Sequence, residues 1–275
     1  MLRVTPSVSV AAAKSYYTKS LSQEEYYSQD QEIVGQWFGK AADKLGLRGQ
    51  VQQAQFEALC DNINPATGKK LTARTKSNRR VGYDLNFHCP KSVSLVYAHT
   101  KDDTILSAFR ESVRETMQEL EVEMQTRVRQ NKKDEDRMTG NMVWAEFVHF
   151  TARPAEENLV PDPHLHSHCY VFNATHDPEE NKWKAGQFGA IKKDAPYYEA
   201  VFHARMANRL RNLGYGIERT DKGWEIAGVS RELIEQFSKR TAKIEKEARE
   251  KGITDPKQKD ALGARNRVGK HLGTP

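Results

Sequence analysis

Short runs in which apolar and polar residues alternate, separated by long stretches with helical spacing, constrain the fold of this chain most strongly. Alternation places every second side chain on one face of a strand. The runs that predict strands are residues 2–10, 81–87, 140–151 and 165–174. Because the stretches between them are too irregular for a strict repeat of strand, helix and parallel strand, an α+β fold is favoured. We expect a central, mostly antiparallel, palm-like sheet flanked by helices that pack on one side of it.

The predicted helices show apolar residues three or four positions apart. In the longest stretch, residues 101–131, Phe109 and Val113 have this spacing. The other predicted helices cover residues 11–18, 36–45, 50–59, 195–213 and the charged segment 231–275. Residues 215–226 predict a hairpin with its turn at residues 221–223.

Composition places limits on the compartment and on the partners. The 275 residues can bury a proper core, and we interpret residues 1–275 as a single domain whose charged C-terminal segment is 231–275. The formal net charge of +6 suggests a polyanionic partner without proving one. Three cysteines without a CxxC spacing fit a reducing compartment. With no signal peptide or long apolar stretch, we expect a cytoplasmic protein with no membrane partner.

The strongest local signal is Pro-Asp-Pro-His-Leu-His-Ser-His at residues 161–168. His164, His166 and His168 alternate, so on a strand they share one face, where imidazoles can converge on a metal ion. His149 lies in the preceding strand-like run, and antiparallel pairing would bring it beside His166 and His168. A site of three histidines leaves coordination positions open for water or a phosphate oxygen, which is typical of a catalytic metal.

The spacing of the three histidines limits which of them share an ion. Neighbours on one face of a strand are ~6.6 Å apart, so the pair is either His164 with His166 or His166 with His168. Prolines cannot donate ladder hydrogen bonds, and the turn-like residues 160–163 therefore predict that the regular strand begins near Leu165. His164 would then lie at a frayed start, which favours His166 and His168.

Two tyrosine pairs, Tyr16-Tyr17 and Tyr26-Tyr27, form the second signal. A free tyrosine is a weak nucleophile because its pKa is roughly 10, but its phenolate becomes accessible close to a divalent cation. Taken alone, the pairs are explained better by aromatic packing. Asp84 interrupts a strand on the face opposite to its neighbours. It is a solvent-facing residue, a group that orients or deprotonates a nucleophile, or a hydrogen-bond partner of a ligating histidine.

The motifs SYY, EEYY, GYDLNFHCPKSVS and PDPHLHSH follow one another in this order. Their combination resembles the relaxase domain of conjugative plasmids, of the TrwC/TraI type within the histidine-hydrophobe-histidine (HUH) endonucleases. The segments at residues 35–47 and 237–241 are also similar, so the resemblance covers nearly the whole chain. It implies a metal-dependent enzyme that nicks one DNA strand at a plasmid origin of transfer, forms a covalent 5′-phosphotyrosine, transfers the strand and so initiates conjugation.

The resemblance also implies roles for individual residues. Tyr16 would be the first nucleophile, Tyr26 the nucleophile of a later transfer, and Asp84 the carboxylate that assists. The metal ligands would be His149, His166 and His168. The ion would be Mg²⁺ or Mn²⁺, although three imidazoles bind softer ions more tightly. His164 is a departure from the family pattern, because it creates a second His-Leu-His one step earlier.

Nucleic-acid contacts are expected from clustered basic residues and from aromatic side chains that stack on bases. The basic residues are Arg74, Lys76, Arg79, Lys91, Arg153, Lys239 and Arg240, and the aromatic ones are Trp144, Trp183 and Trp224. The resemblance implies single-stranded origin DNA with an adjacent hairpin as the partner, covered by the helical C-terminal segment. It further implies accessory proteins, secretion machinery, a following helicase domain in the full-length protein, and passage into the recipient cell with the DNA.

Two other classes of protein share some of these features. A rolling-circle replication initiator or a transposase would use the same chemistry on a different DNA target. A non-catalytic DNA-binding module would hold a structural metal, usually in a closed four-ligand site. The paired tyrosines and the DPHLHSH context favour the relaxase, and the three obvious ligands argue against the structural metal.

Overall fold

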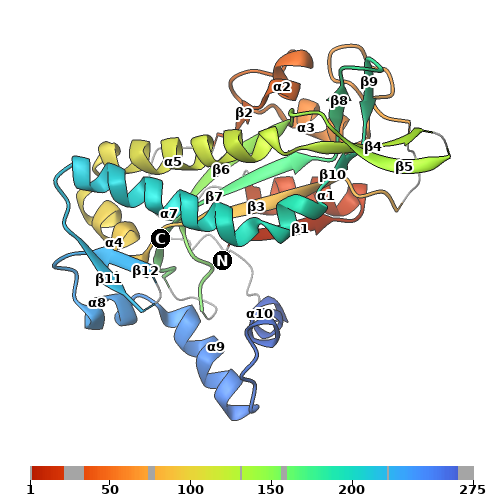
Figure 1. Ribbon diagram of the computed structural model, residues 1–275. Helices are drawn as coiled ribbons and strands as arrows, with labels where there is room; N and C mark the ends of the chain where they lie inside the picture. Colours follow the sequence, from red (N-terminus) through yellow and green to blue (C-terminus); the bar gives the residue numbers. More distant parts are fainter. Residues whose placement is uncertain are drawn as a thin grey trace.

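A five-stranded antiparallel sheet forms the centre of the molecule, with the strand order β1-β3-β7-β6-β2 (Figure 1). Its strands are β1 (Arg3–Ser7), β2 (Gln36–Phe38), β3 (Gly82–His88), β6 (Trp144–Thr151) and β7 (Pro163–Phe172). The computed structural model describes residues 2–21, 34–73, 78–130, 132–155, 160–221 and 223–265. This mixture of helices with an antiparallel sheet confirms the predicted α+β fold.

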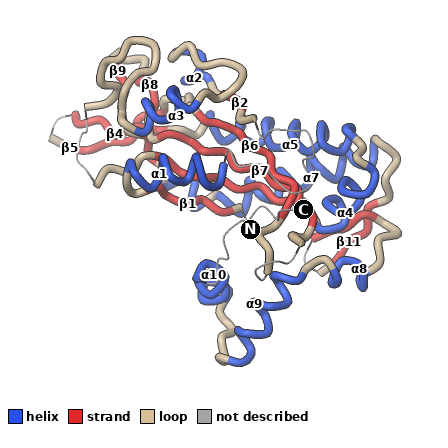
Figure 2. The backbone as a smooth tube through the Cα atoms, turned by 180° about the vertical axis from the view of Figure 1, so that it is seen from behind, coloured by secondary structure: helices blue, strands red, loops and turns tan. Residues whose placement is uncertain are grey.

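Helices cover both faces of the central sheet, as Figures 1 and 2 show from opposite sides. One face carries α4 (Lys91–Thr100), α5 (Asp103–Val122) and α7 (Ala195–Asn212). The other face carries α1 (Val10–Tyr16) with a π-helical turn (Tyr17–Leu21), α2 (Lys40–Lys44) and α3 (Gln53–Cys60). The prediction that helices pack on one side was therefore wrong. The central strands β3, β6 and β7 are buried at nearly every position, so both of their faces need cover.

Alternation along β7 sorts its side chains between the two cores. Leu165, Cys169 and Val171 point into the core under α4, α5 and α7, whereas Tyr170 and Phe172 point into the core under α1 and α3. Since residues two apart share a face, the even-numbered histidines of β7 lie on the α1 side. This face of the sheet carries the candidate site.

Smaller elements extend from this body. The remaining strands are β4 (Gln125–Gln130), β5 (Lys133–Met138), β8 (Thr175–Asp177), β9 (Lys182–Lys184), β10 (Gly186–Gln187), β11 (Ile217–Thr220) and β12 (Gly223–Ile226). The remaining helices are α6 (Gly189–Lys193), α8 (Arg231–Gln236), α9 (Lys239–Glu250) and α10 (Pro256–Arg265). Strands β10, β4 and β5 form one sheet, and the pairs β8-β9 and β11-β12 form two others. In Figure 1 the helices α9 and α10 project away from the body.

Two predicted helices differ from the observed ones. Residues 36–45 form strand β2 and then α2, separated by Gly39, where φ is +103° and a Cβ would lie 2.2 Å from the carbonyl oxygen of Met142. The helix predicted over residues 101–131 ends at Val122 because strand β4 begins at Gln125. The hairpin at 215–226 is confirmed, and so are helices after residue 231 as far as Arg265, whereas residues 266–275 of the predicted segment lie outside the described residues. Among the described residues, no helix has the length and apolarity needed to cross a bilayer.

Candidate metal centre and nucleophile site

A row of three histidines crosses the middle of the sheet. His166 on β7 lies directly opposite His149 on β6 and directly opposite His88 on β3. Side chains of directly opposed residues project from the same face of a sheet, so the three imidazoles are neighbours. The predicted pairing of His149 with His166 is confirmed by this register. The strand, however, begins at Pro163 rather than near Leu165. Its regular register against β3 and β6 begins only at His166, with a shift between His149 and Thr151, so His164 lies within the strand but outside its regular pairing.

His149, His166 and His168 form a triangle of rings. Their centroids are 5.3 Å apart for His149 and His166, 5.0 Å for His149 and His168, and 5.1 Å for His166 and His168. Three imidazoles bound to one ion through metal–nitrogen bonds of about 2.0–2.1 Å have ring centroids roughly 5 Å apart. The spacing of the three rings therefore fits a shared metal ion.

Hydrogen bonds determine which nitrogen two of these rings present. Nδ1 of His166 is 2.8 Å from the backbone oxygen of His164, and Nδ1 of His168 is 2.9 Å from Oδ2 of Asp84. In both rings Nε2 is left for a metal, as in metal sites where a carboxylate or carbonyl orients the ligand. Burial, followed by the neighbouring histidines, lowers the pKa of His166 well below its usual value, which favours the neutral form that ligates metals.

The donor set thus has the right chemistry, because three imidazoles project side by side from one face of the sheet. In the part of the chain that the structure describes, no trio of His, Cys, Asp or Glu side chains is drawn together tightly enough to hold an ion as it stands. The rings would turn about their side-chain torsions to bring their nitrogens onto a common point.

The candidate nucleophile adjoins this triangle. The hydroxyl of Tyr16, at the end of α1, donates a hydrogen bond of 2.5 Å to Oδ2 of Asp84 and lies 3.0 Å from Nδ1 of His168. Asp84 is buried, and burial alone would raise its pKa. The charge of His168 and the hydrogen bonds from His168, Tyr16 and Asn86 outweigh burial and hold the pKa of Asp84 below its usual value. The structure thus joins Tyr16, Asp84 and the histidine triangle.

Asn86 is a member of the site that the sequence analysis missed. Its Nδ2 donates a hydrogen bond of 2.9 Å to Oδ2 of Asp84, so one carboxylate oxygen accepts from Tyr16, His168 and Asn86. Asn86 also lies directly opposite His168 in the sheet. Its position two residues after Asp84, on the same face of a strand otherwise rich in apolar residues, was the signal available in the sequence.

Two of the predicted DNA-contact residues point their charges into the protein. Nη2 of Arg79 donates to the backbone oxygen of Cys60, and Nζ of Lys91 donates to that of Pro163 at 2.9 Å. On α9, Nζ of Lys239 lies 3.1 Å from Asp162, and Nη2 of Arg240 donates to the backbone oxygen of Gly263. The other predicted positions are distributed as follows: Arg153 is half-buried, and Arg74, Lys76 and the candidate second nucleophile Tyr26 lie outside the described residues.

The predicted stacking residues differ in their surroundings. Trp144 is buried in the core between β6 and α5, so its assignment as a base-stacking residue was wrong. Trp183 is half-buried against His176, and Trp224 is half-buried against His203. Among the described residues, no ring contact joins either tryptophan to the histidine triangle.

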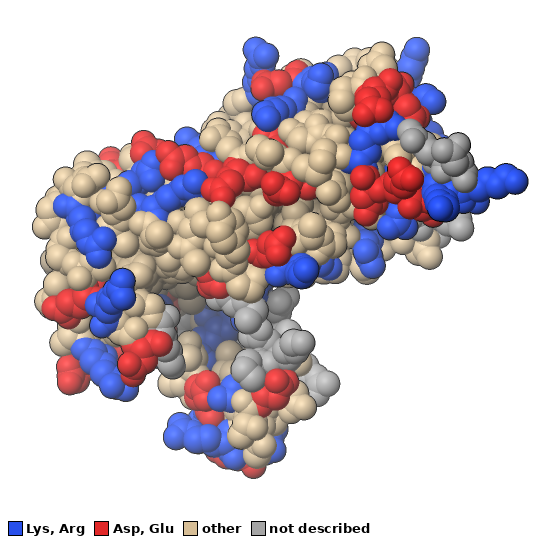
Figure 3. Space-filling view, viewed as in Figure 1, with Lys and Arg blue, Asp and Glu red and all other residues tan. Residues whose placement is uncertain are grey.

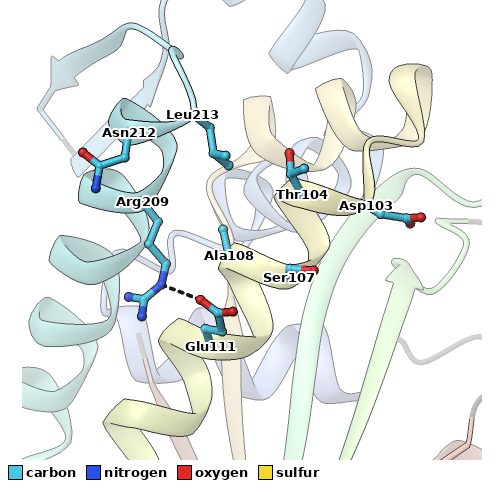
Figure 4. A pocket seen from close by; sticks show the side chains of 8 residues that line it. All are labelled: Asp103, Thr104, Ser107, Ala108, Glu111, Arg209, Asn212 and Leu213. Atoms are coloured by element: carbon cyan, nitrogen blue, oxygen red, sulfur yellow. Dashed lines mark hydrogen bonds and ion pairs between the residues drawn. The ribbon is translucent and has the colours of Figure 1, made fainter.

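Two surface hollows differ in character. A pocket of about 390 Å³ between α5 and α7 is lined by Asp103, Thr104, Ser107, Ala108, Glu111, Arg209, Asn212 and Leu213 (Figure 4). It contains none of the predicted site residues, and the ion pair of Arg209 with Glu111 spans it. The second hollow lies between the body and the C-terminal helices in Figure 3, and basic side chains are visible at its back.

Comparisons with known proteins bear on this arrangement. The family model described as TrwC relaxase matches residues 10–274. A multifunctional conjugation protein TraI of Escherichia coli is 30% identical over 289 residues, which cover 100% of this chain and 15% of that protein. Its counterpart in Escherichia coli strain K12 is 31% identical over 258 residues, which cover 89% of this chain and 14% of that protein. The chain therefore spans a small part of the length of these relatives.

Solved structures of a conjugative relaxase, TrwC, are similar over the full chain. A copper-bound complex of TrwC with oriT DNA has a TM-score of 0.87 and 31% identity, covering 100% of this chain and 93% of that one. A complex with a 27-mer DNA that comprises the recognition hairpin and the cleavage site has a TM-score of 0.84 and 30% identity, with the same coverage. A metal-bound complex with oriT DNA has a TM-score of 0.84 and 30% identity, covering 98% and 93%.

Proposed function

Since this chain belongs to the TrwC relaxase family, we propose that it nicks one DNA strand at a plasmid origin of transfer and passes that strand on through a phosphotyrosine. One observation carries the proposal. The hydroxyl of Tyr16 shares Oδ2 of Asp84 with Nδ1 of His168, whose ring belongs to the histidine triangle. A candidate nucleophile, a proton acceptor and a candidate metal ligand are thereby joined by direct hydrogen bonds.

In the proposed reaction the phenol oxygen of Tyr16 attacks the scissile phosphorus. The new bond joins this oxygen to phosphorus, and the bond between phosphorus and the 3′ oxygen breaks in line with it. The departing 3′ oxygen takes up a proton, and the phenol proton passes towards Asp84. The 5′-phosphotyrosine keeps the energy of a diester, so a 3′-hydroxyl can reverse the step and rejoin DNA without ATP.

Asp84 orients the nucleophile before it serves as a proton acceptor. Because its pKa is held below the usual range, its carboxylate is ionised at neutral pH and accepts the Tyr16 hydroxyl continuously. Asn86 fixes the carboxylate from the strand side. Such positioning keeps the phenol oxygen aimed at one place, which is a large part of what an enzyme site contributes.

His149, His166 and His168 are the residues that would hold a divalent metal ion. When bound there, the ion withdraws charge from the scissile phosphate and stabilises the transition state. We propose Mg²⁺ or Mn²⁺ as the physiological ion. The copper-bound and metal-bound structures of the related TrwC support a divalent ion in this family without fixing its identity.

The DNA is proposed to lie in the hollow between the body and the C-terminal helices, with α9 as part of its cover. Asp162 supports this placement because it holds α9 against the start of β7. Its Oδ2 accepts the backbone N–H of Lys239 at 2.9 Å, and its Oδ1 lies 3.1 Å from Nζ of the same lysine. The substrate is proposed to be single-stranded origin DNA with an adjacent hairpin, by analogy with the TrwC complex that contains a recognition hairpin.

The greater length of the relatives supports one further part of the proposal. The TraI proteins are much longer than this chain, and we propose that a helicase domain follows it in the complete protein. Accessory proteins at the origin and the secretion machinery are proposed as further partners, and the bacterial cytoplasm as the site of cleavage.

Incubation with single-stranded oligonucleotides that carry candidate origins, each with its hairpin, tests the function directly. We expect a covalent protein–DNA adduct on a denaturing gel in the presence of Mg²⁺ or Mn²⁺, and none after chelation. Tight binding without any adduct would favour a non-catalytic DNA-binding module. An adduct formed only on replication origins or transposon ends would favour an initiator or a transposase with the same chemistry.

A further inference from the structure

Five histidines, not three, form one continuous group on the α1 face of the sheet. His88 and His164 continue the triangle on the far side of His166, with ring centroids 5.5 Å and 4.8 Å from the ring of His166 and 5.1 Å from each other. Two triangles of rings therefore share His166. The proposed function uses only the triangle with His149 and His168.

His88 and His164 meet through their ring nitrogens. Nδ1 of His88 lies 3.0 Å from Nε2 of His164, and the two ring planes differ by only 22°. One nitrogen donates a proton to the other, and a change of tautomer in the donor ring would turn a lone pair of each nitrogen towards the same small volume. Both residues are half-buried, which leaves one side of this volume accessible from solvent.

We propose that His88 and His164 bind a second metal ion, a borderline transition-metal ion such as Zn²⁺, Ni²⁺ or Cu²⁺, distinct from the ion of the proposed catalytic triangle. Two imidazole nitrogens that bind one ion at about 2.0–2.1 Å in adjacent positions lie roughly 3 Å apart. The observed separation of the two nitrogens already has this value. The ion takes the place of the shared proton, which moves to the other nitrogen of the donor ring, after small rotations of the two rings, and water completes its coordination.

The position of the neighbouring ring supports this second site. His166 remains with the first ion because its Nδ1 is held by the backbone oxygen of His164. The second site thus has two protein ligands and binds more weakly than the first.

The choice of ion follows from the donor atoms. Imidazole nitrogens suit Zn²⁺, Ni²⁺ and Cu²⁺, whereas Mg²⁺ and Mn²⁺ prefer oxygen ligands. A site with only two imidazole donors therefore favours borderline ions, whereas a hard ion has one more protein ligand at the catalytic triangle.

Metal titration of the folded, metal-free protein tests the inference, with Cu²⁺ and Mn²⁺ as probes in separate calorimetric runs. His88→Gln and His164→Gln should each bind one equivalent of Cu²⁺ less than the unaltered protein, and should bind Mn²⁺ with unchanged stoichiometry. The matched variant His168→Gln should lose the Mn²⁺ equivalent and keep the Cu²⁺ equivalent of the second site. Near-ultraviolet circular dichroism verifies that each variant is folded.

Electron paramagnetic resonance of the Cu²⁺-loaded proteins gives an independent readout. The signal that disappears in His88→Gln should be the one that disappears in His164→Gln, because both rings bind the same ion. Unchanged Cu²⁺ stoichiometry in these two variants would overturn the second site. A different result would contradict the metal site of the proposed function. Mn²⁺ binding would then be unchanged in His168→Gln, while Cu²⁺ binding would still be reduced in His88→Gln and His164→Gln.

Discussion

The hydroxyl of Tyr16 lies 2.5 Å from Oδ2 of Asp84, although 68 residues separate them in the chain. This contact joins the end of α1 to the middle of β3 across the face of the sheet. Tyr16 is thereby distinguished from Tyr17, whose ring is buried against Phe56 at a centroid distance of 4.5 Å. One tyrosine of the pair is presented to the site and its neighbour belongs to the core.

Replacement of Tyr16 by phenylalanine should eliminate the covalent adduct and leave DNA affinity within about twofold. Only the phenol oxygen is removed, and the contacts that bind the phosphate backbone remain. Adduct formation and affinity are measured with the same oligonucleotide, on a denaturing gel and by fluorescence anisotropy. Tyr26→Phe serves as the comparison and should spare the first cleavage while impairing the second transfer. A normal adduct yield from Tyr16→Phe would assign the first nucleophile elsewhere.

Asp84→Asn should slow the cleavage by about 10²–10⁴-fold, the range expected for loss of a proton acceptor. Asn86→Leu should cost less, about 10–100-fold, because it removes only the hydrogen bond that positions the carboxylate. Single-turnover rates at saturating DNA give both values. Equal rates for Asn86→Leu and the unaltered protein would show that Tyr16 and His168 hold Asp84 without help.

The histidine triangle predicts that three alanine variants lose both metal affinity and metal-dependent cleavage. His149→Ala, His166→Ala and His168→Ala should each lower the affinity for Mn²⁺ by at least about tenfold and abolish metal-dependent cleavage, since each removes one of three ligands. The exposed His99 on α4 provides a matched control whose alanine variant should behave normally. Calorimetric Mn²⁺ binding that survives His149→Ala intact would remove this residue from the ligand set.

Phe56→Ala should lower the free energy of unfolding by about 3–5 kcal/mol. The ring of Phe56 is fully buried under α1 and contacts the rings of Tyr17, Tyr170 and Phe172 at centroid distances of 4.5, 5.1 and 4.9 Å. Phe56→Leu keeps most of the buried volume and should cost less than half as much. Urea unfolding followed by tryptophan fluorescence measures both variants, and similar midpoints for the two would argue against a cavity.

Glu146 on β6 predicts a pH-dependent difference in stability. Its carboxylate is fully buried, and burial raises its pKa even though Arg114 and Arg110 oppose the shift. The folded state therefore holds this proton more tightly than the unfolded state, and stability is lost as the pH rises from the usual pKa of a glutamate through the raised one. Glu146→Gln lacks this loss. Urea unfolding is measured at pH 4 and pH 7, taken as mild acid and neutral conditions. The free energy of unfolding of the variant, relative to that of the unaltered protein, should be higher at pH 7 than at pH 4.

Much of the site could be predicted because it depends on alternation along a strand. His166 and His168 share a face by their spacing alone, and the run around His149 needed only to pair with them, as the register confirms. Whether His164 takes part in the strand could not be inferred, because a proline at the first position of a strand costs no ladder hydrogen bond. Pro163 occupies that position.

The parts that escaped prediction depend on contacts between distant segments. His88 reaches His164 across 76 residues, and Asn86 acquires its role only because β3 pairs with β7. Helix propensity likewise could not locate β2 or β4, since the three residues of β2 are too few to show alternation and the mostly polar β4 gains its hydrogen bonds from strands elsewhere in the chain. The helices on the second face of the sheet were not predicted. Their presence is explained by β3 and β7, which are buried at nearly every position and therefore need cover on both faces.

The 152 residues between Tyr16 and His168 also bear on how the protein is made. At a synthesis rate of roughly 5–20 residues per second, the tyrosine leaves the ribosome about eight to thirty seconds before the strand that completes its surroundings. Strand β3 then waits with one edge unpaired until β7 arrives, because β7 lies between β3 and β6 in the sheet. The nascent chain therefore carries the candidate nucleophile apart from its partners until the last central strand inserts, and only then is the proposed site complete.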